Sequence, residues 1–460
     1  MFTIPTPINE PVYSYAPNTN ERELLLAAVK EAKSFQKDIP MYIGGKEIRT
    51  GNKVSIHPPH EKAHILGYFH LGTAEHVNQA IEAALQAKES WEFLPWEQKA
   101  AIFLKAADLI AGPYRYKINA AAMLCQSKSV HQAEIDAACE LADFLRYNVY
   151  FAQEIYKIQP VSSPGVWNRM EYRPLEGFIY ALTPFNFTAI AGNLPTVCAL
   201  MGNVVVWKAA EQQTYASALI MEILIESGLP GGVINLVHGS GPMVGDTVTS
   251  HPDFTGIHFT GSTSVFKTIW RNIAKNLDIY KSYPRIVGET GGKDFVVAHE
   301  SADPTILATA LVRGSFEYQG QKCSASSRAY IPKKIWDETW KIMETQLKSI
   351  KMGSTEDLSN FVNAVITKRA YDSIVDYIEK ARANPKNTII AGGKYDESVG
   401  YFIEPTVILT TDPKSLTMVE EIFGPVLTIY VYEKESYEEL LKLVDSTSEY
   451  SLTGAVIAQD

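Results

Sequence analysis

Hydrophobic residues follow a helical spacing through the first 150 residues of the chain. Apolar positions recur there every three or four residues, as expected for one buried face of a helix. One such set is Val77, Ile81, Ala84 and Leu85. The same spacing predicts a helix from about residue 132 to residue 149, with Cys139 on its apolar face. We therefore expect Cys139 to belong to the core and not to be a catalytic thiol.

The pattern becomes β-like after residue 165. The stretch VWNRMEYRPLEGFIYAL is rich in residues that favour strands and predicts a pair of strands from about residue 165, separated by a bend at Pro174. Four short apolar runs follow at 177–182, 203–208, 232–237 and 254–260, with helical stretches between them. Apolar strands that alternate with helices predict a parallel sheet covered on both faces.

A second α/β set begins at the apolar run 293–299, with helices expected near 304–316, 334–350 and 367–383. The chain is thus predicted to be an α/β protein of at least two domains, which agrees with its 460 residues, 46% of them hydrophobic. Residues 177–207 carry no charge, but their prolines and asparagines argue against a spanning helix. No membrane partner is therefore expected.

Charge and cysteine content bear on the class of protein. Acidic and basic residues are interspersed and leave a net charge of −10, so no nucleic-acid partner is expected. Four scattered cysteines are too few for a disulfide framework in a chain of this length, which favours a reducing compartment. The N-terminal residues show neither an apolar core nor an Arg-rich pattern typical of a targeting segment.

Two glycine turns are candidates for binding a phosphate. Gly239, Gly241 and Gly245 follow a strand with a spacing one residue longer than the dinucleotide fingerprint. In the second turn, Gly261 precedes a helix whose N-terminal amides could hold a pyrophosphate. Either could equally be a tight strand-to-helix turn, so the pattern alone does not choose between them.

Several polar residues occur where packing does not require them. Lys208 ends the expected strand 203–208 and Glu211 follows three residues later, where the two could bond ribose hydroxyls or simply form a surface ion pair. Glu289 lies among glycines and could act as a general base or as a structural acceptor of amide hydrogens. Asn186 lies between two phenylalanines and could present its amide to an oxyanion. Cys323 lies among small and polar residues in EYQGQKCSASS, unlike a buried structural cysteine.

Three histidines, His57, His60 and His64, have a loosely ligand-like spacing. Two prolines among them and the lack of a cysteine partner make them a poor fit to tetrahedral zinc. We expect a solvated turn here and no metal site.

Six motifs resemble those of a known family. SFEYQGQKCSASS, VGETGGK, TPFNFTAIAGNL, WKAAE, FTGS and EEIFGP are similar to the aldehyde dehydrogenase superfamily, and the residues around Cys323 and Asn186 resemble its 1-pyrroline-5-carboxylate dehydrogenase branch. The resemblance implies an aldehyde dehydrogenase-like α/β fold. It places N-terminal helices and a Rossmann-type NAD domain in 1–287, with oligomerisation-type strands at about 160–176, and a catalytic domain in 288–460.

The resemblance also implies catalytic roles. Cys323 matches the nucleophile that forms a thiohemiacetal with the aldehyde, and Asn186 and the Cys323 amide would hold its oxyanion. After hydride transfer to the nicotinamide, Glu289 matches the residue that deprotonates the water that hydrolyses the thioester. Positions matching the family's NAD contacts are Thr183, Lys208, Gly261, Ser262, Thr263, Ser264, Val265, Glu421 and Phe423. The family uses the Gly261 turn, which makes the Gly239 turn structural, and Glu211 favours NAD over NADP because it would repel a 2′-phosphate.

The substrate implied by the branch is L-glutamate γ-semialdehyde, oxidised to L-glutamate in proline degradation. Phe187 resembles an aromatic wall beside the aldehyde, and Ser324 either a donor to the substrate carboxylate or a small filler. The family continues beyond residue 460, so a C-terminal truncation is expected, with lower stability and weaker substrate binding. A homodimer is expected where the C-terminal segment is present, in the mitochondrial matrix or alternatively in the cytoplasm.

Rival functions remain open at this point. Another semialdehyde dehydrogenase, such as one for succinate semialdehyde, would use the same residues. A truncated, catalytically silent chain that only binds NAD is the second alternative. A cysteine hydrolase is disfavoured because no histidine motif points to Cys323.

Overall fold

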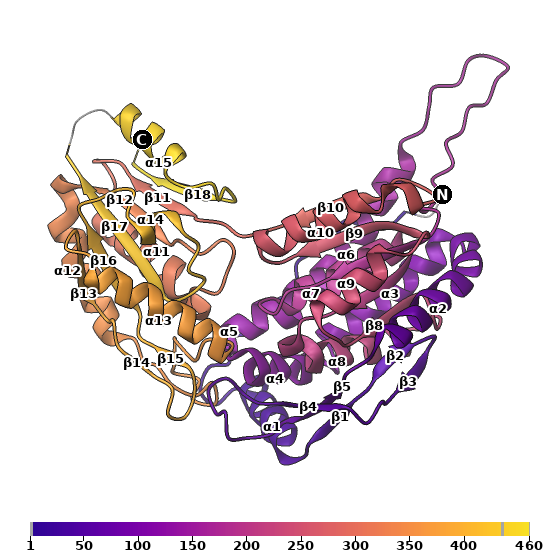
Figure 1. Ribbon diagram of the computed structural model, residues 1–460, viewed down its shortest axis with the longest axis horizontal. Helices are drawn as coiled ribbons and strands as arrows, with labels where there is room; N and C mark the ends of the chain where they lie inside the picture. The colour runs from indigo at the N-terminus through magenta and orange to yellow at the C-terminus, as the bar shows by residue number, and fades with distance from the viewer. Residues whose placement is uncertain (1–2, 434–436, 460) are drawn as a thin grey trace. The chain divides into compact units, whose positions relative to one another are not determined.

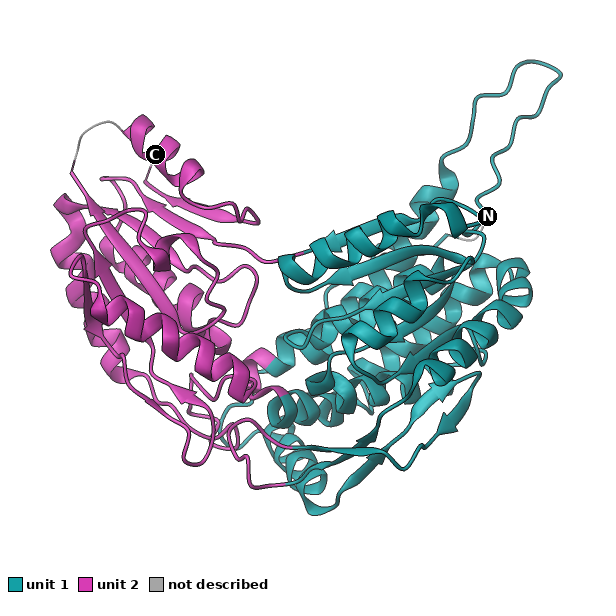
Figure 2. Cartoon of the chain, viewed as in Figure 1, with its two compact units in different colours: residues 1–56, 65–125, 133–289 teal, residues 57–64, 126–132, 290–460 magenta. Residues whose placement is uncertain are grey.

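The structure is a computed structural model that describes residues 3–433 and 437–459 (Figure 1). The chain forms two units, coloured separately in Figure 2. Unit 1 contains residues 1–56, 65–125 and 133–289, and unit 2 contains residues 57–64, 126–132 and 290–460. The chain passes from unit 1 to unit 2 after residue 289. The earlier segments 57–64 and 126–132 also belong to unit 2, so the units are not two consecutive stretches of sequence.

A seven-stranded sheet forms the centre of unit 1, in the order β10-β9-β6-β7-β8-β2-β3. Five neighbouring strands are parallel: β6 (Phe178–Leu182), β7 (Val204–Lys208), β8 (Ile234–Val237), β9 (Phe254–Thr260) and β10 (Arg285–Glu289). The antiparallel edge consists of β2 (Met41–Ile43) and β3 (Lys46–Ile48). The predicted parallel sheet is thus confirmed, and the apolar runs are buried because helices cover its faces.

The helices of unit 1 either precede β6 along the chain or alternate with the parallel strands after it. They are α1 (Asn20–Ser34), α2 (Ala74–Phe93), α3 (Trp96–Ala111), α4 (Arg115–Gln126), α6 (Leu141–Lys157), α7 (Thr188–Leu200), α8 (Thr214–Glu226), α9 (Gly241–Thr249) and α10 (Thr263–Lys275). A small separate sheet joins β1 (Lys37–Ile39), β5 (Gly67–His70) and β4 (Lys53–Ile56). Within the described residues, no helix combines the length and the apolar character needed to cross a bilayer.

The helix predicted over 132–149 consists of three consecutive parts. These are α5 (Val130–Ala133), a π-helical turn η1 (Glu134–Glu140) and the start of α6. Cys139 is buried, as expected, and its Sγ lies 3.3 Å from a guanidinium nitrogen of Arg115. The periodicity located the helix but could not show the wider π turn, which changes its register by one residue.

Of the two strands predicted on either side of Pro174, the second forms β6 and the first does not form in the described single chain. Oligomerisation-type strands at about 160–176 stay a prediction, because they would need a second copy. Residues 158–177 contain neither helix nor strand, and they run outward from unit 1 and back as a long loop (Figure 1). Its internal bonds include the amide of Met170 to Oε1 of Gln159 at 2.9 Å. Strand-forming composition becomes a strand only where a neighbouring strand supplies backbone partners, and this loop has none within one copy's described residues.

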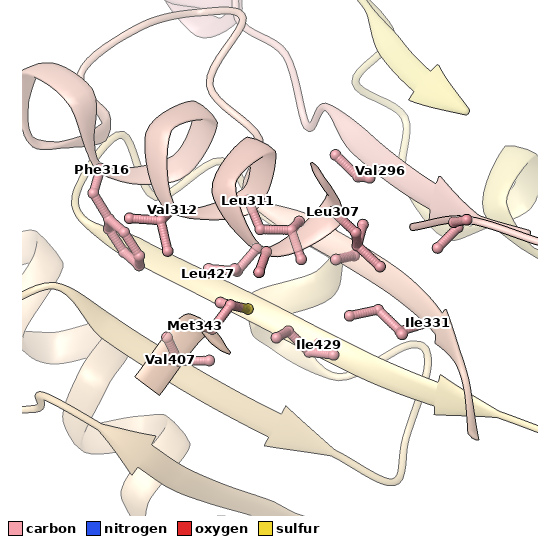
Figure 3. Packing of buried hydrophobic residues seen from close by; sticks show 14 of the residues in the cluster. Val296, Leu307, Leu311, Val312, Phe316, Ile331, Met343, Val407, Leu427 and Ile429 are labelled. Carbon is pink, nitrogen blue, oxygen red and sulfur yellow. The ribbon is translucent and has the colours of Figure 1, made fainter. Parts of the chain in front are cut away.

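Unit 2 is built on a six-stranded sheet in the order β13-β16-β17-β12-β11-β18. The strands are β11 (Phe295–Ala298), β12 (Arg328–Pro332), β13 (Asn387–Ala391), β16 (Thr406–Thr410), β17 (Val426–Tyr432) and β18 (Gly454–Ile457). The expected helices are confirmed as α11 (Pro304–Phe316), α12 (Lys333–Ser349) and α13 (Lys368–Ala383). Helix α11 places Leu307 and Leu311 in one buried cluster with Leu427 and Ile429 of β17 (Figure 3).

Candidate active site

The carboxyl ends of four parallel strands lie side by side in unit 1. In the β-ladder, Thr260 of β9 is opposite Glu289 of β10, and Leu182 of β6 is opposite Lys208 of β7. The alignment continues one residue further, because the amide of Gly261 donates to the Glu289 carbonyl at 3.2 Å. The strand order reverses between β6 and β9, and open α/β sheets bind ligands outside the carboxyl ends at such a point.

Two predicted cofactor residues are joined at this edge. The Thr183 amide donates to the carbonyl of Lys208 at 3.2 Å, and the Trp207 indole donates to the Thr183 hydroxyl at 3.0 Å. Lys208 is 8% exposed, and burial lowers the pKa of its ammonium while the nearby Glu211 opposes that shift. Glu211 begins the short turn η2 (Glu211–Gln213).

The turn after β9 has the features of an anion site. Ser262 caps α10 by accepting the amide of Val265 at 3.4 Å, and Ser264 lies in the exposed first turn. The buried Oγ1 of Thr263 has no hydrogen-bond partner among the described residues. A Cβ on Gly261 would lie 2.8 Å from the ring of Phe259, so a larger residue does not fit. The helix N-terminus thus offers amides and a hydroxyl to a negatively charged group.

The other glycine turn performs a packing role in the structure. Ser240 caps α9 through the amide of Met243, and a Cβ on Gly239 would lie 2.7 Å from the Met243 side chain. Gly241 and Gly245 are inside α9, with open space at the position of an added Cβ. The close approach of helix and strand accounts for Gly239 without a ligand.

Asn186 and Phe187 immediately precede α7. Asn186 is 4% exposed and Phe187 is half-buried at the residue before the first helical turn. This loop follows β6 directly, so both side chains belong to the same edge of the sheet as Thr183.

In unit 2, Cys323 follows a left-handed backbone turn. Tyr318, Gln319 and Gly320 have φ angles of 50°, 55° and 65°, a conformation that tertiary contacts must hold in place. The amide nitrogen of the Gln319 side chain donates to the carbonyls of Ser127 at 3.1 Å and Ala364 at 2.8 Å. Segment 126–132 therefore helps to fix the turn before the cysteine.

The four cysteines differ in their surroundings. Burial raises the pKa of Cys125, Cys139 and Cys198 to about 12, so these thiols are poor nucleophiles at neutral pH. Cys198 and Cys323 are both half-buried, but only Cys323 has an exposed neighbour, Ser324. The raised pKa of Cys198 and the exposed residue beside Cys323 therefore favour Cys323 as the reactive thiol.

A pair of glycines connects Glu421 to the backbone of Cys323. The amide of Gly292 donates to Oε1 of Glu421 at 3.0 Å. A Cβ on Gly291 would lie 2.1 Å from a Glu421 oxygen, and one on Gly292 would lie 2.5 Å from the Cys323 carbonyl. Burial raises the pKa of Glu421. Phe423, two residues on, has a φ of 56°.

Sequence reasoning missed the two charged residues that follow these glycines. Lys293 is 1% exposed, its Nζ has no hydrogen-bond partner in the described part of the chain, and burial lowers its pKa to about 7. Burial also raises the pKa of Asp294 to about 6, although its Oδ1 accepts the amide of Thr453 at 2.7 Å. The GGKD motif was the available signal. That this motif lies against the backbone of Cys323, through Gly292, is visible only in the fold.

The prediction of a solvated turn at the three histidines is wrong. His60 is 2% exposed, and its Nδ1 lies 2.8 Å from the Ser127 hydroxyl. The segment packs within unit 2, so His60 is a core histidine with hydroxyl partners. No group of side chains suited to a metal ion occurs in residues 3–433 and 437–459.

The predicted site residues thus divide into two sets. Unit 1 carries the set at the sheet edge with Asn186 and Glu289, and unit 2 carries the set around Cys323 and Glu421. Each set is brought together within its own unit by the contacts described above.

Comparison with known proteins gives a consistent result. Residues 48–460 match the model of the aldehyde dehydrogenase family. The chain is 52% identical to the delta-1-pyrroline-5-carboxylate dehydrogenase of Agaricus bisporus, covering 100% of this chain and 84% of that protein. It is 51% identical to the mitochondrial delta-1-pyrroline-5-carboxylate dehydrogenase of Dictyostelium discoideum, covering 99% of this chain and 82% of that one.

A solved structure is similarly close. The crystal structure of delta-pyrroline-5-carboxylate dehydrogenase from Mycobacterium tuberculosis bound with NAD superposes with a TM-score of 0.96. The two sequences are 50% identical, and the match covers 100% of this chain and 85% of the other.

Proposed function

This chain belongs to the aldehyde dehydrogenase family, and on that premise we propose that it oxidises L-glutamate γ-semialdehyde to L-glutamate with NAD, in proline degradation. The observation that carries the proposal is the identity of 46–52% with delta-1-pyrroline-5-carboxylate dehydrogenases over nearly the whole chain. The enzyme is an NAD-dependent oxidoreductase. Its substrate aldehyde is the open form of 1-pyrroline-5-carboxylate.

The residues at the sheet edge fit a dinucleotide. The N-terminus of α10 with the unpartnered Thr263 hydroxyl suits the pyrophosphate, and Lys208 and Glu421 suit ribose hydroxyls. We infer contacts also from Thr183, Gly261, Ser262, Ser264, Val265 and Phe423. The carboxylate of Glu211 would repel a 2′-phosphate and so favours NAD over NADP. When bound, NAD accepts a hydride from the substrate carbon.

Cys323 supplies the covalent step. Its thiolate forms a C–S bond with the aldehyde carbon, and the carbonyl oxygen becomes an oxyanion. The side-chain amide of Asn186 and the Cys323 backbone amide donate hydrogen bonds to that oxygen. Loss of hydride from the same carbon restores the C=O bond and leaves a thioester on Cys323.

Glu289 acts in the hydrolysis. Its carboxylate takes a proton from a water molecule as the water oxygen bonds to the thioester carbon. The C–S bond then breaks, and glutamate is released with its new carboxylate while Cys323 regains a free sulfur. Phe187 forms an apolar wall beside the aldehyde, and Ser324 donates to the carboxylate at the amino-acid end of the substrate.

The arrangement of the protein follows as a further part of the proposal. We infer that unit 1 binds NAD and unit 2 carries the nucleophile. The loop 158–177 exposes 91% of Val161 and 81% of Trp167, which supports pairing with a second copy, because monomers rarely expose such residues together. Several relatives are named as mitochondrial, which supports a mitochondrial matrix location.

The test is NADH formation by the 460-residue chain with NAD and 1-pyrroline-5-carboxylate, followed by absorbance. Succinate semialdehyde serves as the comparison aldehyde because it lacks the α-amino group. Preferential turnover of 1-pyrroline-5-carboxylate is expected. Equal or better turnover of succinate semialdehyde would replace the proposed substrate, and NAD binding without turnover of either would favour a catalytically silent chain.

A further inference from the structure

Asp136 caps the helix that follows Asn186. Its two carboxylate oxygens accept the backbone amides of Thr188 and Ala189, each at 2.9 Å. These are the first two residues of α7, and Asn186 precedes Thr188 by two positions. Asp136 is 1% exposed, so both bonds are shielded from water. A carboxylate from another part of unit 1 thus holds the start of α7.

A cap from outside the helix is needed here because of the residue at the usual capping position. The first amides of a helix have no partner within it, and Ser, Thr, Asp or Asn just before the helix normally accepts one of them. That position in α7 is Phe187, which makes no side-chain cap. Asp136 supplies the missing acceptor and a charge suited to the helix dipole. Position 187 is thereby available for an aromatic side chain.

The loop is fixed on its other side as well. The side-chain amide of Gln213 donates to the carbonyl of Phe185 at 3.0 Å, and its Oε1 lies 3.5 Å from the hydroxyl of Thr188. Asn186 is therefore bracketed by residues held from two directions. It has little freedom to turn its backbone.

Asp136 is itself held in a rigid surrounding. It lies in the π-helical turn η1, a feature frequent at functional sites. Two residues earlier, Glu134 forms an ion pair with Arg115 and accepts the Tyr15 hydroxyl at 2.7 Å. Both ionic side chains are buried, which anchors the turn that presents Asp136 to α7.

We propose that Asp136 is a positioning residue for the reaction, which acts by capping α7 and so orienting the side chain of Asn186 toward the oxyanion. This inference rests on the proposed function, in which Asn186 stabilises that oxyanion. A displacement of about 1 Å in a catalytic group can cost about a hundredfold in rate. Loss of the cap should therefore lower kcat and leave NAD binding unaltered.

The test compares Asp136→Asn with Asp303→Asn. The Asp136 variant keeps one acceptor oxygen and places an amide NH₂ against the second backbone amide. Asp303 is a matched control because it caps α11 in unit 2 by accepting the amides of Thr305 and Ile306 at 2.7 and 3.0 Å. We expect Asp136→Asn to lower kcat by about tenfold to a hundredfold. The Kd for NAD should stay within about twofold, since no NAD contact is removed.

Two readouts separate positioning from general stability. Hydrogen exchange in a peptide covering residues 184–190 should be faster in Asp136→Asn and unchanged in Asp303→Asn. The double variant Asp136→Asn/Asn186→Ala should have the kcat of Asn186→Ala alone, because Asp136 acts through Asn186. Unchanged kcat in Asp136→Asn, or additive losses in the double variant, would overturn the inference.

Failure of the proposed function would look different. If Asn186→Ala retained full kcat, the oxyanion role of Asn186 would be wrong regardless of Asp136. If Asp136→Asn did not fold, Asp136→Glu would provide the same comparison, since it keeps the charge but moves the carboxylate by one methylene.

Discussion

The backbone amide of Gly292 donates a hydrogen bond to Oε1 of Glu421 at 3.0 Å. The glycine pair that precedes Lys293 is thereby tied to the carboxylate that we propose contacts NAD. Because Gly292 also lies against the Cys323 carbonyl, one short segment connects a cofactor residue to the nucleophile.

Gly291→Ala should displace Glu421 and raise the KM for NAD. The added Cβ would lie 2.1 Å from a Glu421 oxygen, so the carboxylate has to move. Gly245→Ala is the matched control, because its Cβ would enter open space in α9. Steady-state kinetics with varied NAD checks both variants. An unchanged KM in Gly291→Ala would argue against the NAD contact of Glu421.

Cys323→Ala should abolish NADH formation and retain NAD affinity, since the sulfur makes the only covalent bond to the substrate. Cys198→Ala should remain active, because burial keeps that thiol protonated. Turnover and the Kd for NAD are measured on both proteins. Residual dehydrogenase activity in Cys323→Ala would refute the assignment of the nucleophile.

Glu289→Gln should uncouple the two halves of the reaction. The amide cannot take a proton from water, so the thioester should form and then hydrolyse about 10²–10⁴-fold more slowly. Rapid mixing should show a burst of NADH of about one per active site, followed by a slow phase. Glu82→Gln, an exposed change on α2, should behave as the native enzyme. Native steady-state rates in Glu289→Gln would contradict the role of general base.

Lys208→Ala should weaken NAD binding with a smaller effect on kcat. Its ammonium is buried at the sheet edge, and hydrogen bonds from such a charged group contribute about 1.5–3 kcal/mol, or roughly tenfold to a hundredfold in affinity. Calorimetric titration with NAD measures the change, with the exposed Lys341→Ala as control. Equal affinities in the two variants would place the ribose contact elsewhere.

Lys293→Met should flatten the pH dependence of stability above neutral pH. The folded pKa of Lys293 is about 7, below its ordinary value of 10.5, because burial outweighs the attraction of Glu421, Glu420 and Asp294, and Arg328 adds repulsion. Between pH 7 and pH 10.5 the unfolded chain therefore holds a proton on Lys293 that the folded chain has lost. Across this range the group raises the free energy of unfolding as pH rises, by up to about 1.4 kcal/mol per pH unit.

Methionine has a similar shape and no charge, so the variant should be more stable than the native chain at pH 7, with the difference shrinking toward pH 10. Denaturant unfolding at several pH values measures this. A constant difference across that range would show that Lys293 titrates normally.

The sequence alone could predict the features that depend on local spacing. The apolar run 254–260 became β9 with the same bounds, and α11 ends at Phe316 as expected. The predicted strands 203–208 and 254–260 placed Lys208 and Gly261 at the carboxyl ends of strands, as the structure does. Short-range periodicity was sufficient there because parallel strands align their carboxyl ends.

Features that depend on distant contacts could not be predicted in this way. Asp136 is 52 residues from the amide of Thr188 that it accepts, and His60 is 67 residues from Ser127. The loop 158–177 has strand-forming composition without a strand beside it. In each case the sequence shows the residue type, and only the fold shows its partner.

Segments 57–64 and 126–132 have a consequence for how this protein can be made and recombined. Both segments pack with residues 290–460. During synthesis they emerge from the ribosome before those residues, so they cannot reach their native packing until the C-terminal part has been made. A gene cut at residue 289 would separate Gln319 from the Ser127 carbonyl it binds. The two units are therefore not exchangeable modules, and chimaeras with relatives should fold only when both early segments come from the same parent as the C-terminal half.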